Sequence, residues 1–154
     1  MKIKNIHIKL MIIVLLPLFL GGCLNELFEK RDRTLRVPAQ LAFSHTDLIV
    51  DEGAGDVTID VQLIARQMDT DLSASFVVDG ASTASAGTHY TISTPSPVTI
   101  AANSSTAPLT VNVPDGPLTA GNNVQLILVL QDNSQAGVEA SETQGTFTLT
   151  IRGS

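Results

Sequence analysis

Residues 56–66 read Asp-Val-Thr-Ile-Asp-Val-Gln-Leu-Ile-Ala-Arg, and they carry the most regular pattern in the chain. Aliphatic side chains occupy every second position, with mostly polar ones between them. This period of two is that of a β-strand with one face against a core and the other against water, as in an antiparallel sheet. We therefore expect a strand here whose core face carries Val57, Ile59, Val61, Leu63 and Ala65.

Similar patterns extend from this strand in both directions. Upstream, residues 40–43 and 47–51 predict a short, interrupted first strand, and residues 52–55 predict a turn. Downstream, residues 124–130 are nearly all apolar, which predicts a central strand buried on both faces, and residues 131–144 predict a long polar loop. The other expected strands are residues 72–78, 89–92, 98–101, 109–113 and 146–151. About seven or eight short strands, with no helical period after residue 38, are typical of an all-β, immunoglobulin-like antiparallel β-sandwich.

The N-terminal segment has the pattern of an export signal. Residues 1–10 carry three lysines and no acid, and residues 10–20 carry no charge. A basic start, an apolar centre of about 7–15 residues and small residues before a cut are typical of a secretory signal peptide. A membrane-spanning helix needs roughly 20 apolar residues, and this run is shorter and interrupted by Pro17. We predict a cleaved signal over residues 1–22, with a retained anchor helix as the less favoured alternative.

Cys23 is the only cysteine in the chain, and it follows Leu20-Gly21-Gly22. This run resembles the lipobox of bacterial lipoproteins, in which an aliphatic residue and two small residues precede a cysteine. The resemblance implies that the Cys23 thiol is the site of lipid attachment and that the signal is cut just before it. The alternative is a lone cysteine at the end of an ordinary signal. Residues 23–38, which mix both charge signs, would then form a tether to a domain over residues 39–154.

The predicted domain is strongly acidic. The whole chain has 9 basic and 15 acidic residues, but after residue 38 only Arg66 and Arg152 are basic, against twelve acids. A nucleic-acid partner requires a basic face, so we expect none. The acidic charge also serves solubility and holds the domain off an anionic membrane surface, which leaves the N-terminal lipid as the expected contact with the membrane.

Four segments of the domain resemble Calx-beta domains. Residues 83–90, Thr-Ala-Ser-Ala-Gly-Thr-His-Tyr, are similar to the Thr-Ala-x-x-Gly-x-Asp-Tyr signature of that family. Residues 48–53, Leu-Ile-Val-Asp-Glu-Gly, resemble its opening Val-x-Glu-Gly, and residues 98–103 and 109–113 look like its strand, turn and following strand. The resemblance covers most of residues 40–152 and implies a β-sandwich.

The middle of the domain is equally similar to Ig-like domains of bacterial surface lipoproteins. The similarity lies in Tyr90 and in residues 97–100, 111–113, 117–118 and 124–128. Such domains commonly belong to nutrient-capture or glycan-binding systems, so this resemblance implies other envelope proteins or glycans as partners. The lipobox-like motif favours this second family by context.

The Calx-beta resemblance also raises the question of a calcium site, because calcium-binding members cluster acids at one end of the sandwich. Ca²⁺ takes about six to eight oxygen ligands, several of them from carboxylates. Glu52 matches the family's acidic position and Asp115 lies near its acidic strand end, but His89 replaces the signature aspartate and residues 116–123 contain no acid. Two acids of a predicted turn are further candidates, Asp69 and Asp71. We predict no metal site and keep a calcium-dependent adhesion or structural module as the alternative.

No catalytic constellation is evident in the sequence. The predicted domain has two histidines, His45 and His89, and no Gly-x-Ser-x-Gly elbow, so no activated nucleophile is indicated. No glycine-rich phosphate loop precedes a helix. Tyr90, the sole tyrosine, is expected to pack in the core, which counts against a glycan-binding face of exposed rings. We therefore expect no enzyme activity, no catalytic residue and no cofactor.

These patterns predict a lipid-anchored, non-enzymatic lipoprotein of the cell envelope. Its sandwich would act as a binding or assembly module, with surface glycan or nutrient capture as the expected setting. We expect it at the outer membrane, on the periplasmic or the outer surface, held by the lipid on Cys23.

Overall fold

The computed structural model describes residues 38–154, which form strands and loops. In this part of the chain no helix is long and apolar enough to cross a membrane. The predicted signal peptide, the lipobox-like motif, Cys23 and all of the tether except Pro38 fall within residues 1–37, outside the described residues.

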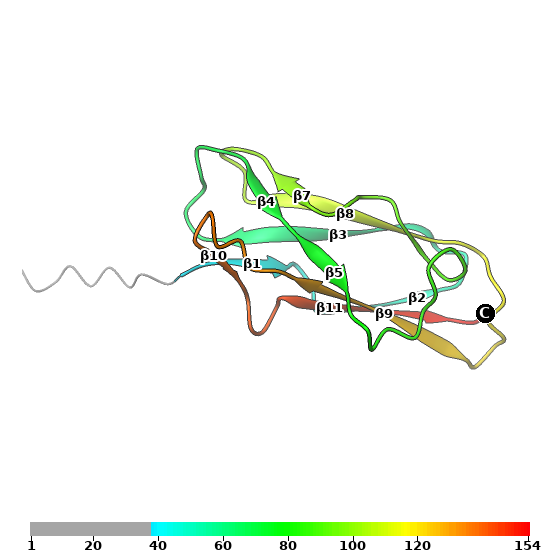
Figure 1. Cartoon of the computed structure of the whole chain (residues 1–154). Coiled ribbons are helices and arrows are strands. Elements are labelled where there is room, and N and C mark those ends of the chain that lie inside the picture. The colour runs from blue at the N-terminus through cyan, green and yellow to red at the C-terminus, as the bar shows by residue number, and fades with distance from the viewer. Residues whose placement is uncertain (1–37) are drawn as a thin grey trace, which may run out of the picture. The chain divides into compact units, whose positions relative to one another are not determined.

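Two main sheets form the layers of the fold, and a short third sheet extends one of them (Figure 1). Sheet A has the strand order β10-β1-β3-β8-β6, sheet B has the order β2-β11-β9-β5, and sheet C pairs β4 with β7. All strand pairs are antiparallel except β1 with β10 and β2 with β11. The strands are β1 (Ala39–Phe43), β2 (Asp47–Asp51), β3 (Gly55–Ile64), β4 (Leu72–Ala74), β5 (Phe76–Val78), β6 (Thr91–Ile92), β7 (Val98–Ile100), β8 (Thr106–Val113), β9 (Asn123–Leu130), β10 (Val138–Ala140) and β11 (Thr146–Arg152). The predicted all-β sandwich is confirmed.

β3 is the central strand of sheet A, and its core face is the one that the alternation predicts. Its buried residues are Val57, Ile59, Val61 and Leu63. The prediction was wrong at the C-terminal end, because the strand stops at Ile64 and Ala65 is exposed. Along β3, the pairing with β1 ends at Ile64 and the pairing with β8 ends at Gln62, so no ladder continues the strand.

The first predicted strand is interrupted because the chain changes sheets. β1 pairs with β3 in sheet A, whereas β2 pairs with β11 in sheet B. Backbone bonds hold the bend on both sides: Ser44 N–H donates to the Asp60 carbonyl, and Thr148 N–H donates to the Thr46 carbonyl, each at 2.9 Å. Since β1 covers only residues 61–64 of β3, the first half of β3 has no strand neighbour on that side among the described residues.

The predicted strand over residues 72–78 is divided in the same way. β4 pairs with β7, with Leu72 opposite Ile100, and β5 pairs with β9, with Phe76 opposite Leu130. Leu72, Ala74 and Phe76 are buried, whereas Val78 is 39% exposed because β5 lies at the edge of sheet B.

β9 is central in sheet B, but the prediction that both of its faces are buried was wrong. Leu126, Leu128 and Leu130 are buried, and they face the core. Ile127 and Val129 alternate with them on the outer face of sheet B and are only partly buried. In a two-layer fold a continuous apolar run marks a strand with one core face and one uncharged outer face.

The predicted polar loop over residues 131–144 contains a strand, which corrects that prediction. β10 pairs in parallel with β1 at the edge of sheet A, and Val138 is 1% exposed. The backbones of Asn133 and Val138 bond to each other in both directions, at 2.8 and 3.1 Å. Three residues are too few to produce a readable alternation, so the sequence pattern did not reveal β10.

The core lies between sheets A and B. Phe43 of β1 and Phe147 of β11 meet there, with ring centroids 5.7 Å apart. Tyr90 is 5% exposed, as its expected core packing requires. Residues 38–154 contain no cysteine, so apolar packing and the backbone ladders hold the sandwich without a disulfide.

Candidate functional site

Glu52 is the acidic side chain that the fold buries, at 8% exposed. It follows β2 in a turn where Gly53 has a φ of 81°, a left-handed conformation that glycine adopts without strain. The backbone N–H of Leu118 donates to both carboxylate oxygens of Glu52, at 3.1 Å each. Hydrogen bonds to charged groups contribute about 1.5–3 kcal/mol. The carboxylate therefore ties the end of β2 to the loop that follows β8.

Close packing of glycines around Glu52 brings Asp115 to the same end of the sandwich. A β-carbon at Gly116 would collide with Oε1 of Glu52, so any other residue there would require the Glu52 carboxylate to move. A β-carbon at Gly53 would lie 3.7 Å from Oδ1 of Asp115. The structure thus brings Glu52 and Asp115 to neighbouring loops, as the Calx-beta resemblance implied.

The remaining acids considered for calcium do not join this pair. Asp69 and Asp71 follow the opposite end of β3, a strand of 10 residues, which spans about 33 Å at roughly 3.3 Å per residue. Asp71 instead accepts the backbone N–H of Ala102 at 2.9 Å. Within residues 38–154 no group of three or more His, Cys, Asp or Glu side chains could hold a metal ion. Glu52 and Asp115 alone are fewer than the several carboxylates that Ca²⁺ takes, so the described residues do not fit a calcium site.

His89 holds a loop together. Its Nδ1 accepts the backbone N–H of Ser85 at 2.9 Å, and its own backbone N–H donates to the Ser85 carbonyl at 2.9 Å. Gly87 N–H donates to the carbonyl of Tyr90 at 2.8 Å in the same loop. The imidazole thus closes this loop at the position where the Calx-beta signature has an aspartate.

His45 lies in the bend between β1 and β2. Oγ of Ser44 lies 3.0 Å from Nδ1 of His45, in an exposed hydrogen bond between two consecutive residues. Asp47 accepts a hydrogen bond from the hydroxyl of Thr46 at 3.3 Å. Because Asp47 does not orient the imidazole, these side chains do not form a Ser-His-Asp triad.

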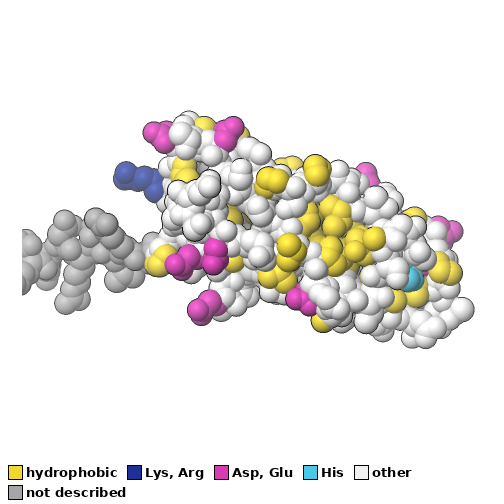
Figure 2. All heavy atoms as spheres, viewed as in Figure 1, with side chains coloured by type: hydrophobic (Ala, Val, Ile, Leu, Met, Phe, Trp, Pro, Cys, Tyr) yellow, Lys and Arg dark blue, Asp and Glu magenta, His cyan; other side chains and the backbone are white. Residues whose placement is uncertain are grey.

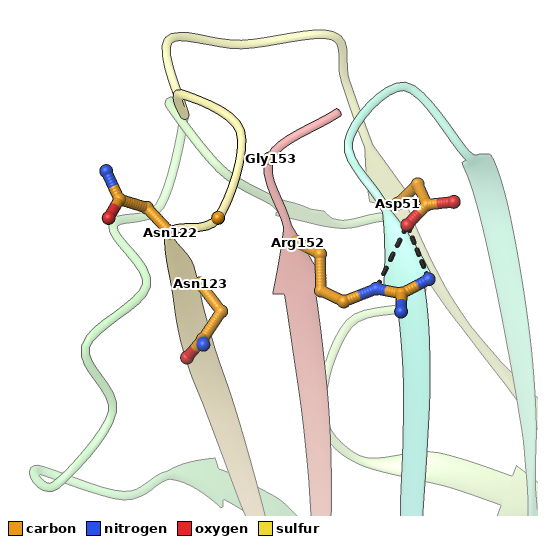
Figure 3. Close-up of a pocket in the computed structure, with 6 residues that line it drawn as sticks. Asp51, Asn122, Asn123, Arg152 and Gly153 are labelled. Atoms are coloured by element: carbon orange, nitrogen blue, oxygen red, sulfur yellow. Dashed lines mark hydrogen bonds and ion pairs between the residues drawn. The ribbon is translucent and has the colours of Figure 1, made fainter.

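A polar hollow of about 190 Å³ lies where the ends of β2, β9 and β11 meet (Figure 3). Nε and Nη2 of Arg152 donate to Oδ1 of Asp51 at 3.0 and 2.7 Å, the one ion pair of the described residues. Asn122 and Asn123 lie on the other side of β11 in Figure 3. Sequence reasoning missed this site, because only the parallel register of β2 with β11 sets Asp51 opposite Arg152. The sequence signal that could have pointed to Arg152 is that the domain has only two basic residues.

A second, largely apolar hollow lies beside β2. It has a volume of about 160 Å³ and is lined by His45, Leu48, Thr58, Ile59 and Phe147. It exists where β1 has left sheet A, so that the first half of β3 has no strand neighbour to close the gap between the sheets. No motif in the sequence pointed to it.

Acidic side chains dominate the charge of the surface. Figure 2 shows them spread along the margins of one face, with basic side chains at one place only and apolar side chains grouped in the middle. Of the two cations after residue 38, Arg152 is paired with Asp51. The free surface charge of residues 38–154 is therefore almost entirely negative.

Comparison with solved structures identifies the fold. No protein-family model and no curated protein sequence matches the chain. The apo form of a Calx CBD1 domain is 18% identical with a TM-score of 0.63, over 76% of this chain and 98% of that one. The calcium binding domain CBD12 of CALX1.1 is 17% identical with a TM-score of 0.59, over 73% of this chain and 44% of that one. EndoBT-3987 of Bacteroides thetaiotamicron, solved with a Man5GlcNAc product, is 13% identical with a TM-score of 0.50, over 73% of this chain and 30% of that one.

At these identities the likeness establishes the fold alone. The chain has a Calx-beta-like β-sandwich. It spans less than half of the CBD12 structure.

Proposed function

We propose that this protein is a lipid-anchored, non-enzymatic module of the cell envelope that binds or assembles with other envelope proteins or with glycans. The observation that carries the proposal is the lipobox-like run Leu20-Gly21-Gly22-Cys23 ahead of a cysteine-free sandwich with its own core. A single acyl chain gives only marginal membrane binding, so the two or three chains of a mature lipoprotein would provide stable anchoring.

The contacts of the histidines support a non-enzymatic role. An activating base needs a free acceptor nitrogen and a group that orients the ring. The acceptor Nδ1 of His89 is used by Ser85, and no carboxylate orients His45 in its contact with Ser44. A hydrolase screen of the purified chain tests this point, and activity that is lost in His45→Ala or His89→Ala would contradict it.

The polar hollow at Asp51 and Arg152 supports a glycan ligand. Carboxylate, guanidinium and amide groups offer the donors and acceptors that sugar hydroxyls require, and the side chains of Asn122 and Asn123 are exposed. A glycan array probed with the wild type and with Asn123→Ala tests this role, with Gln135→Ala as a control at an exposed amide outside the hollow. Binding that is absent, or equal in all three proteins, would leave envelope proteins as the partners.

Mass spectrometry of the native N-terminus tests the anchor. We expect a chain that begins at Cys23 and carries acyl groups, and we expect Cys23→Ala to leave the membrane fraction. Recovery of an unlipidated chain that begins before residue 23 would refute the proposal. For a lipidated chain, membrane fractionation tests whether it lies in the outer membrane. Protease treatment of intact cells then tests whether it faces the periplasm or the outside of the cell.

A calcium-dependent adhesion or structural module is the less supported alternative. Its one support is the approach of Asp115 to the turn at Glu52, and the hydrogen bonds from Leu118 to Glu52 count against it. Calorimetric titration with calcium distinguishes the two functions. The absence of both binding heat and a thermal shift at about 1 mM calcium would end this alternative.

A further inference from the structure

β2 is the longest edge strand of the two main sheets. It has five residues, whereas the other edge strands, β5, β6 and β10, have two or three. Its outward-facing Ile49 is 57% exposed, the highest value among the large apolar side chains of the described residues. An exposed edge of this kind is a template for pairing with another strand.

The backbone of β2 has one side engaged and one side open. The Thr46 carbonyl accepts from Thr148, and Glu52 N–H donates to the Arg152 carbonyl at 2.8 Å. In a parallel ladder the even-numbered residues therefore face β11, and Asp47, Ile49 and Asp51 turn their N–H and C=O groups away from it. Of these groups, the Asp51 carbonyl accepts the N–H of Ala54 in the following turn at 3.2 Å. Within residues 38–154 no strand pairs with that open side.

The apolar hollow lies directly beside this edge. A strand added to β2 would place the side chain opposite Leu48 toward the gap between the sheets, because Leu48 itself lines the hollow. An engineered apolar cavity of roughly 150 Å³ accommodates benzene, so a hollow of about this size holds one apolar side chain. Backbone pairing and a side-chain pocket together are the two components of strand addition.

The charges around the edge select the partner. Asp47 and Asp51 lie at the two ends of β2, where Arg152 offsets part of the charge of Asp51. Asp56 and Asp60 flank Thr58 on the other side of the hollow. Antiparallel pairing of two β2 strands about Ile49 would place Asp47 opposite Asp51 of a second copy, and like charges directly opposite are destabilising. Basic residues at the same positions of a foreign strand would be attracted instead.

We propose that the β2 edge is a docking site for an extended segment of another protein, in which apolar residues are flanked by Lys or Arg. The inference rests on the proposed binding role and names its partner class. It does not rest on the lipid anchor, because the edge is complete within residues 38–154.

The test uses the full chain, purified in detergent from whole-cell lysate, and a fluorescent peptide. The probe is Ser-Lys-Leu-Val-Leu-Lys-Ser with blocked ends. One control peptide has Glu in place of both Lys residues, and another has Pro in place of the central Val. We expect saturable binding of the Lys peptide, with each control peptide bound at least about tenfold more weakly.

Variants of β2 separate backbone pairing from other contacts. Ile49→Pro removes an N–H that faces the open side and no ladder bond to β11, and proline is tolerated at such a position of an edge strand. This variant should weaken binding at least about tenfold. Ile49→Thr keeps that N–H and should stay within about threefold of the wild type. Asp47→Lys should reverse the preference from the Lys peptide to the Glu peptide.

Each of three results would overturn the inference: no saturable binding at about 1 mM peptide, unchanged binding in Ile49→Pro, or unchanged preference in Asp47→Lys. Thermal melting checks the fold of Ile49→Pro, and if it unfolds, the charge reversal by Asp47→Lys decides alone. A dimer that Ile49→Pro dissociates would show a second copy at the edge instead. Because failed lipidation leaves the peptide result unaffected, the two proposals fail separately.

Discussion

The two edges of sheet B are finished in opposite ways. On the β5 side the chain continues through residues 79–84 along β9, and Asp79 N–H donates to the Ile127 carbonyl at 2.8 Å. Ile127 N–H then donates to Oγ of Ser82, and Gln125 N–H to Oγ1 of Thr83, at 2.9 Å each. On the β2 side no described segment plays this part. Beside β5, hydroxyls complete the partners of β9, and the outward N–H of Phe76 donates to Oγ of Ser96 at 3.0 Å. Along β2, no segment of residues 38–154 pairs with the outer side of the strand.

The difference shows that an open edge can be firmly held. β2 is tied at its end by Glu52, whose carboxylate accepts from Leu118, while its outer side chains remain in solvent. A strand fixed at its end and open along its side is suited to accept a partner without rearranging.

Removal of the Glu52 carboxylate should have the largest effect. In Glu52→Ala the Leu118 N–H loses its charged acceptor, and we expect a loss of about 2 kcal/mol in the free energy of unfolding. Urea denaturation measures it. Glu142→Ala, an exposed acid, is the matched control and should change little. Equal stability of the two variants would show that the end of β2 is not held in this way.

Loss of a hydroxyl should open the β5 side. Ser82→Ala leaves the partly buried N–H of Ile127 without its acceptor, at an expected cost of about 1.5 kcal/mol. Amide hydrogen exchange at Ile127 should accelerate together with the loss in stability. Ser93→Ala, at an exposed serine, serves as the control. Slow exchange at Ile127 in Ser82→Ala would mean that the loop does not close this edge.

The two faces of β2 should respond differently to truncation. Leu48 faces the apolar hollow and is 38% exposed, whereas Ile49 faces outward and is 57% exposed. We expect Leu48→Ala to cost about 1 kcal/mol of unfolding free energy and Ile49→Ala less than that. Thermal or chemical unfolding compares them directly, and the reverse order would contradict the assigned register.

Neutralisation of the exposed ion pair should have the smallest effect. The side chains of Arg152 and Asp51 are 55% and 61% exposed, so solvent and salt screen their attraction. Asp51→Asn should therefore change the free energy of unfolding by about 0.3 kcal/mol. The melting temperatures of the wild type and Asp51→Asn should differ slightly in low salt. In about 1 M NaCl, where the Debye length is about 3 Å, the two melting temperatures should become equal. A large or salt-independent loss would mean that the pair holds β2 in place.

Most of the strands were predictable because alternation is a local property. The pattern of residues 56–66 specified the core face of β3, and the alternation of Phe147, Leu149 and Ile151 specified that of β11. β10 was not predictable, because its three residues owe their strand to the neighbouring β1. The open outer face of β9 was missed because an apolar run looks the same whether one face or both are covered.

The sites were less predictable than the strands. Glu52 and Asp115 were singled out by resemblance, and the structure brings their loops together, but it also occupies Glu52 with a backbone N–H. The hollows beside β2 and at Arg152 draw residues from strands up to about a hundred positions apart in the chain. No short motif encodes such a group.

By itself the sequence determined the fold class, the strand faces and the acidity of the surface, because each follows from the order of side chains within a few residues. Only the tertiary structure decided which strands lie at the edges and which of those edges stays open. That outcome depends on the chain crossing from sheet A to sheet B after Phe43 and on Ser82 and Thr83 meeting β9. Pairing between distant segments sets these contacts, and it is therefore not readable from any one segment alone.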